Sequence, residues 1–283
     1  MKVTLKDGSF KEYDQPMSIY DIALDISEGL ARVACVGEID GETKDLRTIV
    51  DKDCTLNILT FDSDAGKKAY RHTCAHVLAQ AVKNLYPDAK LTIGPAIDNG
   101  YYYDFDMPSL DRDALDAIEK EMKKIIKKGD RLERYTLSKD EAIKLMTERD
   151  EPYKVEMIKE HPDTDELSFY QQGDFIEFCA GPHLMSTKPI KAFKLTASSG
   201  AYWRGDEHNK MLTRIYGTAY TKKADLEEYL EYLADIKNRD HNKLGRDMDL
   251  FTTVDVIGQG LPLFMPKGTN DPEAAALDRG SGG

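Results

Sequence analysis

Two pairs of side chains that can bind metal or water constrain this chain most strongly. His72 and His76 stand four residues apart, and Cys179 and His183 repeat that spacing much later in the sequence. On a helix, this spacing places both side chains on one face, one turn apart. A fold that brings the pairs together would gather three imidazoles and a thiol at one point. Such a set can hold a zinc ion or a reactive water, which suggests hydrolysis.

Each pair is ambiguous when taken alone. Two histidines at this spacing are often ordinary surface or partly buried residues. A zinc peptidase would need glutamate directly after His72 as general base, and Thr73 stands there instead. The Gly181-Pro182 dipeptide predicts a tight turn rather than a helix for the second pair, and a Cys-His nucleophile is conceivable there. We expect Cys74, which lies between the two histidines, to be a core residue.

Two further residues are candidates. Glu177 precedes Cys179 by two positions, on the same face if the strand continues. Lys154 lies in the segment Glu151–Val155. Each of the two also has an ordinary interpretation as a surface residue.

Composition is that of a globular protein with two or three domains: 283 residues, 41% hydrophobic and 32% charged. We find no apolar run of about 18 residues, as a membrane span requires, and no signal-peptide pattern at the N-terminus. Four scattered cysteines are too few for a disulfide scaffold, so we expect reduced thiols and a cytoplasmic location.

Charge is distributed unevenly along the chain. The net charge of −12 argues weakly against non-specific binding to nucleic acid. Residues 1–62 carry a net −6, whereas residues 186–224 carry a net +6. The basic stretch could contact a polyanion, or it could be an ordinary solvated surface.

The first 62 residues read as a small α/β unit. Asp7-Gly8 predicts a hairpin turn, and Ser18 should cap a helix whose apolar residues recur as far as Leu30. Strands expected at 32–39 and 54–61 complete a ubiquitin-like β-grasp. Residues 63–67 are polar and contain a glycine, which predicts a linker.

The rest of the chain predicts an α+β fold. Its signals include a hairpin at Asp98-Asn99-Gly100, a C-cap at Gly129 and a capping box that starts at Ser138. We expect helices at 68–85, 111–128, after Ser138 and at 226–236, and strands at 91–97, 101–105, 168–172 and 174–178.

These motifs resemble the N-terminal half of bacterial-type threonyl-tRNA synthetases. The resemblance covers nearly everything up to about residue 268. It rests on five segments: RHTCAH at 71–76, IGPAIDNGYYYDF at 93–105, CAGPH at 179–183, AYWRGDEHNKMLTRIYGTAY at 201–220 and RDHNKLGRDMDLF at 239–251.

The resemblance implies a domain order. It starts with a TGS β-grasp domain and continues with a larger α+β editing domain, also found in alanyl-tRNA synthetases. A linker helix and the start of a class II catalytic core follow, and the last residues look like an appended tail. The corresponding ranges are 1–62, 63–224, 225–257, 258–269 and 270–283. With the rest of that core and the anticodon-binding domain absent, we expect no ligase activity from this chain.

What such a half would do is proofreading. Serine lacks one methyl group of threonine, and a methyl is worth only about 1–3 kcal/mol in a pocket. The resemblance therefore implies hydrolysis of the ester of mischarged seryl-tRNA(Thr). It implies that His72 activates or orients the water and that Lys154 stabilises the oxyanion or holds the water.

The remaining roles also come from the resemblance. His76, Cys179 and His183 should line the pocket. Glu177 should meet the aminoacyl amine, although the family often has aspartate there. Tyr103 should wall the serine pocket, and the acceptor-stem phosphates should meet Arg204 and Arg214.

The expected partner is the acceptor end of tRNA(Thr). We expect a monomer, since dimerisation in this family comes largely from the core, and the full-length family protein should be a homodimer. We expect editing to need no cofactor, with zinc as an open possibility at His72, His76, Cys179 and His183. ATP, magnesium and the threonine-selecting zinc belong to the core. A non-catalytic RNA- or partner-binding module with a structural zinc site is the alternative.

Overall fold

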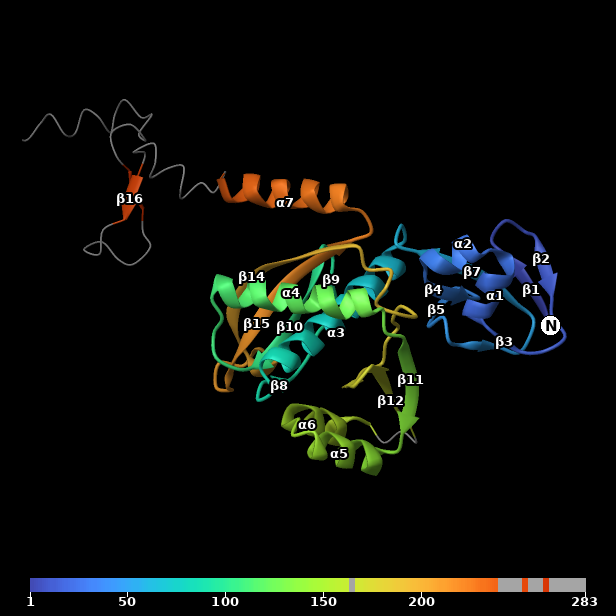
Figure 1. Ribbon diagram of the computed structural model, residues 1–283, viewed down its shortest axis with the longest axis horizontal. Helices are drawn as coiled ribbons and strands as arrows, with labels where there is room; N and C mark the ends of the chain where they lie inside the picture. Colours follow the sequence, from blue (N-terminus) through green and yellow to red (C-terminus); the bar gives the residue numbers. More distant parts are fainter. Residues whose placement is uncertain (163–165, 239–250, 254–261, 265–283) are drawn as a thin grey trace, which may run out of the picture. The chain divides into compact units, whose positions relative to one another are not determined.

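The computed structural model describes residues 1–162, 166–238, 251–253 and 262–264. These residues form a mixed α+β protein, which confirms the predicted fold class. The chain divides into two compact units, Met1–Lys223 and Ala224–Gly283. The first unit contains an N-terminal sheet domain and a larger second domain (Figure 1).

The N-terminal domain is a five-stranded sheet in the order β2-β1-β7-β4-β5. Strands β1 and β7 run parallel, and the other neighbours are antiparallel. Helix α1 packs on this sheet through Ile19 and Ile22, which lie in one buried cluster with Val3 and Leu56. This is the predicted ubiquitin-like arrangement. The strands of the sheet are β1 (Lys2–Leu5), β2 (Phe10–Glu12), β4 (Ala34–Ile39), β5 (Glu42–Lys44) and β7 (Cys54–Thr60). Strands β3 (Met17–Ser18) and β6 (Ile49–Val50) pair with each other outside this sheet.

Two predictions in this domain were wrong in detail. The apolar pattern from Ile19 to Leu30 forms two helices, α1 (Ile19–Ile26) and α2 (Glu28–Val33), because Ser27 caps the second with its side chain. The strand expected from residue 32 begins at Ala34, since α2 occupies the preceding residues.

The stretch 63–67 is not a linker. Ser63 caps helix α3 (Asp64–Leu85), and its hydroxyl donates to the carbonyl of Thr60 at 2.8 Å and accepts from the amide of Gly66 at 3.0 Å. A Cβ atom added at Gly66 would overlap the Thr60 carbonyl. The end of β7 and the start of α3 are therefore in direct contact, and polar composition here reflects capping rather than flexibility.

The second domain is built on an antiparallel sheet in the order β14-β15-β10-β8, with β9 beside β10. Its strands are β8 (Lys90–Leu91), β9 (Ala96–Ile97), β10 (Gly100–Asp106), β14 (Ala192–Tyr202) and β15 (Met211–Tyr220). Helix α3 contacts β10 and β15, and α4 (Arg112–Lys128) contacts α3 and β14. Gly129 caps α4 in the left-handed conformation, as predicted.

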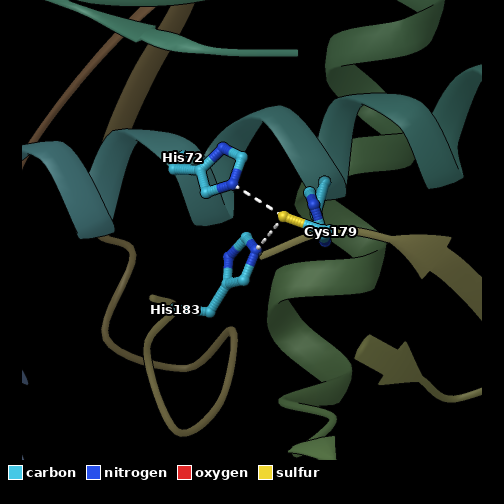
Figure 2. A group of neighbouring side chains, drawn as sticks. His72, Cys179 and His183 are labelled. Carbon is cyan, nitrogen blue, oxygen red and sulfur yellow. Dashed lines mark hydrogen bonds between the residues drawn. The ribbon is translucent and has the colours of Figure 1, made fainter. Parts of the chain in front are cut away.

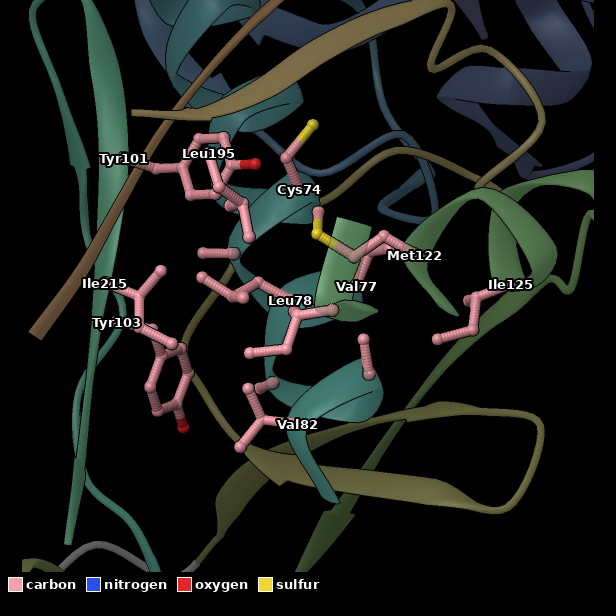
Figure 3. Packing of buried hydrophobic residues seen from close by; sticks show 14 of the residues in the cluster. Cys74, Val77, Leu78, Val82, Tyr101, Tyr103, Met122, Ile125, Leu195 and Ile215 are labelled. Atoms are coloured by element: carbon pink, nitrogen blue, oxygen red, sulfur yellow. The ribbon is translucent and has the colours of Figure 1, made fainter. Parts of the chain in front are cut away.

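Helix α3 is buried on almost all sides, because the sheet with β10 and β15 packs on one side of it and helix α4 on another. Figure 3 shows Leu78 and Val77 between Tyr103 of the sheet and Met122 of α4. A helix with apolar contacts all round needs little amphipathic pattern, and its polar residues must find partners inside the protein. Cys74 is 1% exposed in this core, which confirms its prediction as a core residue.

A smaller layer completes the second domain. It contains the sheet β11-β12-β13 and two helices, of which α5 opens with the predicted capping box of Ser138 and Glu141. Phe169 and Ile158 belong to its own apolar cluster. The elements are β11 (Leu132–Leu137), α5 (Lys139–Glu148), α6 (Pro152–Glu160), β12 (Leu167–Gln172) and β13 (Phe175–Phe178).

All of α7 (Lys223–Asn238) except its first residue belongs to the second unit. This unit also contains β16 (Phe251–Thr253) and β17 (Pro262–Phe264), which pair with each other. A helix thus fills the first part of the predicted linker 225–257, but residues 251–253 form a strand instead, as their β-branched and aromatic composition favours. The predicted tail at 270–283 lies outside the described residues. No helix among the described residues is long and apolar enough to cross a membrane.

Candidate functional site

The structure brings the two widely separated pairs together where α3 meets the loop after β13. His72 and His76 lie one turn apart on α3, whereas Cys179 and His183 lie outside any helix, in the loop. One ligand atom from each of the four residues lies within 4.8 Å of the others. Figure 2 shows Cys179 between the rings of His72 and His183.

The loop depends on Gly181. Its φ of +75° lies in the left-handed region, which side chains other than glycine rarely adopt. A Cβ atom at this position would also overlap the ring and hydroxyl of Tyr170. The turn that carries Cys179 and His183 back towards α3 therefore requires glycine for two independent reasons.

The hydrogen bonds of His72 fix the position of its proton. Its Nδ1 lies 3.0 Å from the carbonyl oxygen of Gly94, which can only accept, so Nδ1 donates. In a neutral ring, Nε2 is then the bare nitrogen. This Nε2 lies 3.0 Å from Sγ of Cys179.

The same reasoning applies to His183 through Thr73. The Thr73 hydroxyl donates its hydrogen to the carbonyl of Ala69 at 2.8 Å and accepts from the amide of Leu184 at 3.0 Å. His183 Nδ1 lies 3.2 Å from that hydroxyl oxygen and must therefore donate to it. The bare Nε2 of His183 faces Sγ of Cys179 at 3.4 Å.

Two unprotonated nitrogens thus face one thiol. Because the thiol of Cys179 carries a single proton, it can donate to only one of the two. The other lone pair points into the site without a donor among these residues. Imidazoles held by Nδ1–H bonds to oxygen acceptors are the arrangement that zinc-binding histidines use. The set could bind a metal ion such as zinc, or a water that donates to the bare nitrogen.

Burial keeps these imidazoles neutral. It lowers the pKa of His72 to about 4, and it lowers the pKa of His76 and of His183 well below the ordinary value. Burial also raises the pKa of the Cys179 thiol to about 12. Reactive cysteines have lowered pKa values, so this environment does not favour a Cys-His nucleophile.

Access to the set is one-sided. His76 is 2% exposed and His183 fully buried, whereas His72 and Cys179 are partly exposed. A ligand from solvent therefore meets His72 and Cys179 first. The other two imidazoles form the floor of the site.

A second polar cluster lies beside the first. Lys154 on α6 forms an ion pair with Glu177 on β13, and the hydroxyl of Tyr103 on β10 donates to Glu177 at 2.7 Å. The side chains of Lys154 and Glu177 are only 5% and 2% exposed. The surface interpretation of both residues was therefore wrong. Burial raises the pKa of Glu177, and the positive charge of Lys154 further lowers the pKa of His72.

The two predicted arginines are held by carboxylates. Arg214 forms two hydrogen bonds to Asp104, at 2.7 and 2.8 Å, and its guanidinium lies over the ring of Tyr102. Arg204 pairs with Glu156 at 2.8 Å and also with Glu160. Neither arginine joins the His/Cys cluster.

Three contributors escaped sequence reasoning. Thr73 was noticed only as the residue that replaces a glutamate, yet its hydroxyl orients His183. Tyr170 packs its ring 4.5 Å from that of His183 and donates to Asp45 of the N-terminal domain at 2.8 Å. The position of Thr73 between two histidines was a usable signal; nothing in the sequence connects Asp45 to the site.

Comparison with known proteins agrees with this architecture. The TGS domain family matches residues 1–60, and the "Threonyl and Alanyl tRNA synthetase second additional domain" family matches residues 167–216. Threonine–tRNA ligases of Acetivibrio thermocellus and Clostridium perfringens are each 58% identical over 269 residues, 95% of this chain. The chain is similar to the N-terminal part of threonine–tRNA ligases. It spans 42% of the length of these relatives.

The range that matches the synthetase family's second additional domain includes Glu177, Cys179 and His183, together with both predicted arginines. His72 and His76 lie outside the matched range and reach the site only through the packing of α3. The similarity to threonine–tRNA ligases spans both parts.

Proposed function

We propose that this chain hydrolyses the ester of seryl-tRNA(Thr) and so proofreads the attachment of threonine to tRNA. Its similarity to threonine–tRNA ligases and its match to the second additional domain support this substrate class. The observation that carries the proposal is the bare Nε2 of neutral His72. It lies at the accessible side of the site, and the buried ammonium of Lys154 is close enough to lower its pKa.

Hydrolysis needs a placed water and a stabilised oxyanion. In the proposed reaction, a water donates to His72 Nε2 while its oxygen attacks the ester carbonyl carbon. The ammonium of Lys154 stabilises the charge that develops on the carbonyl oxygen. The bond to the terminal ribose oxygen then breaks, this oxygen takes up the proton, and serine leaves with a carboxyl group. With a pKa of about 4, His72 orients the water rather than retaining its proton at neutral pH.

The remaining residues select the substrate. We assign the aminoacyl ammonium to Glu177, whose carboxylate is already oriented by Lys154 and by the hydroxyl of Tyr103. Tyr103 walls the serine side chain, and His76 and His183 form the floor behind Cys179. A wall that excludes the methyl of threonine gives the second discrimination that one binding step cannot supply.

The proposed partner is the acceptor end of tRNA(Thr). We assign its phosphates to the basic stretch 186–224, where Arg204 remains 42% exposed beside its carboxylates. Phosphate contacts of this kind position a nucleic acid without reading its sequence. We further propose that the site serves a threonine–tRNA ligase that attaches threonine to tRNA(Thr) with ATP.

In this proposal, editing needs no cofactor. A zinc ion would nevertheless fit the donor set, held by His72, His76, Cys179 and His183, and it would supply a Lewis acid only if one of the four ligands left its position open to water or substrate. The closed set of four protein ligands supports one alternative: a structural zinc site in a non-catalytic RNA- or partner-binding module. Loss of the fold on chelation, without any esterase activity, is the outcome expected from that alternative.

Deacylation tests the proposal directly. Seryl-tRNA(Thr) and threonyl-tRNA(Thr) are incubated with the chain, and release of each amino acid is followed with and without a chelator. We expect faster release of serine, no effect of the chelator, and loss of at least about a hundredfold in a His72→Ala/His76→Ala variant, since catalysis by a positioned side chain contributes this much.

A matched control is Lys11→Ala, which lies outside the basic stretch and removes an ion pair with Asp25 whose two side chains are 38% and 47% exposed. This variant should retain full activity. Absence of serine release by the wild-type chain, or equal release of both amino acids, would sink the proposal.

A further inference from the structure

An ion pair of the N-terminal domain reaches the loop that carries His183. Arg47 lies between β5 and β6, and its guanidinium donates to backbone carbonyls of the second domain. Its Nε donates to Leu132 at 2.9 Å, its Nη1 to His183 at 3.3 Å and its Nη2 to Leu184 at 2.9 Å. The planar guanidinium has donors in fixed directions, so these contacts fix the loop in more than one direction.

Asp45 completes the contact by binding the backbone amide of the same residue, His183. One carboxylate oxygen accepts from Arg47 Nη1 at 2.9 Å. The other accepts from the backbone amide of His183 at 3.2 Å and from the hydroxyl of Tyr170 at 2.8 Å. The amide of His183 is thus bound by Asp45, and its carbonyl by Arg47.

The pair is well shielded from water. The side chains of Arg47 and Asp45 are 15% and 11% exposed. Removing charges from water is costly, and the cost is offset only where geometry is good and the remaining donors and acceptors are satisfied. Arg47 and Asp45 meet this condition through groups that belong to the second domain. The pair is therefore more than a surface contact between neighbours.

From these contacts we propose that Asp45 and Arg47 of the N-terminal domain position His183 in the editing site. Thr73 orients the ring of His183 from α3, while Asp45 and Arg47 hold its backbone and Tyr170 packs against the ring. Asp45 and Arg47 are positioning residues, since they touch neither Cys179 nor the unprotonated Nε2 of His183. Their effect on hydrolysis rests on the proposed function, whereas the placement of His183 does not.

Amide hydrogen exchange tests the placement without any substrate. In an Asp45→Ala variant, NMR should report exchange at the His183 amide at least about tenfold faster, because its acceptor is gone. The Leu184 amide bonds to Thr73 within the second domain and should stay protected, as should the amides of β10. Unchanged exchange at His183 overturns the proposal, and so does faster exchange spread evenly over the domain.

Deacylation kinetics test the consequence. For Asp45→Ala and Arg47→Ala we expect kcat to fall about tenfold to a hundredfold with little change in KM, as is usual when a residue that orients a site residue is lost. Arg47→Lys should remain impaired, because an ammonium cannot reach all three carbonyls. Tyr170→Phe removes only one donor to Asp45, so it serves as the test variant if the alanine variants do not fold.

Lys11→Ala serves as the matched control, since it removes an exposed ion pair with Asp25 in the same domain. It should leave both exchange and kcat unchanged. An unchanged kcat in Asp45→Ala and in Arg47→Ala refutes the positioning role. If the wild-type chain releases no serine, the proposed function fails, and the His183 exchange rate still decides whether the pair positions this residue.

Discussion

Replacing Lys154 by methionine should expose the energetics of the buried pair with Glu177. Methionine has a similar volume but no charge, so the variant leaves a carboxylate that is 2% exposed without its cation. Removing one member of a buried pair costs about 3–5 kcal/mol, because the partner remains charged and desolvated. The hydroxyl of Tyr103 offsets only part of this, since a single hydrogen bond to a charged group contributes about 1.5–3 kcal/mol.

Urea denaturation measures this loss. With a slope of about 3 kcal/mol/M, a loss of 3 kcal/mol lowers the midpoint by about 1 M. Glu177→Gln in addition to Lys154→Met removes the stranded charge, so the double variant should recover part of the lost stability. The pKa of Glu177 is raised by burial, and a protonated carboxyl carries no charge. Relative to wild type at the same pH, the single variant should therefore lose less at pH 5.5 than at pH 8.

The matched control is Lys90→Met, whose partner Asp150 is 79% exposed. An exposed pair of this kind contributes about 0–1 kcal/mol. A loss in Lys154→Met no larger than in Lys90→Met would refute the reasoning. A double variant less stable than Lys154→Met alone would refute it as well.

Two further predictions concern the histidines and the loop. The pKa values of His72, His76 and His183 are lowered in the folded state, so the unfolded chain binds more protons between about pH 6.5 and pH 4. Thermal stability should fall as pH falls through this window, more steeply than in a His72→Gln variant; equal slopes would contradict this. Gly181→Ala should destabilise by at least about 1–2 kcal/mol, the cost of a left-handed backbone, plus the overlap with Tyr170. A melting temperature within 1 °C of wild type, by calorimetry, would contradict this.

Local signals predicted the elements well where a side chain acts on its own neighbours. Ser138 and Glu141 bond to each other's backbone, and Gly129 ends α4 in the conformation that glycine favours. These effects span only a few residues, so the sequence contains them completely. The break at Ser27 was missed because the apolar pattern runs on through it, and its capping bonds outweigh that pattern.

Burial of charge could not be predicted in the same way. Lys154 and Glu177 look like surface residues, because charged side chains are rarely fully buried unless paired. Their pairing joins α6 to β13, and only the packing of both elements against β10 creates it. The spacing of the histidines and of Cys179 with His183 indicated a site, but not that Thr73 would set the tautomer of one ring.

The junction between β7 and α3 is a rigid connection. The Ser63 cap and the close approach of Gly66 to Thr60 join the N-terminal sheet to the helix without a flexible linker. With a rise of about 1.5 Å per residue, His72 lies about 12 Å along α3 from its first residue. A tilt of the sheet by a few degrees would therefore displace the imidazole rather than be absorbed by a hinge. Inserting glycines after Phe61 would make this junction flexible. A tilt of the N-terminal sheet would then no longer displace the imidazole of His72.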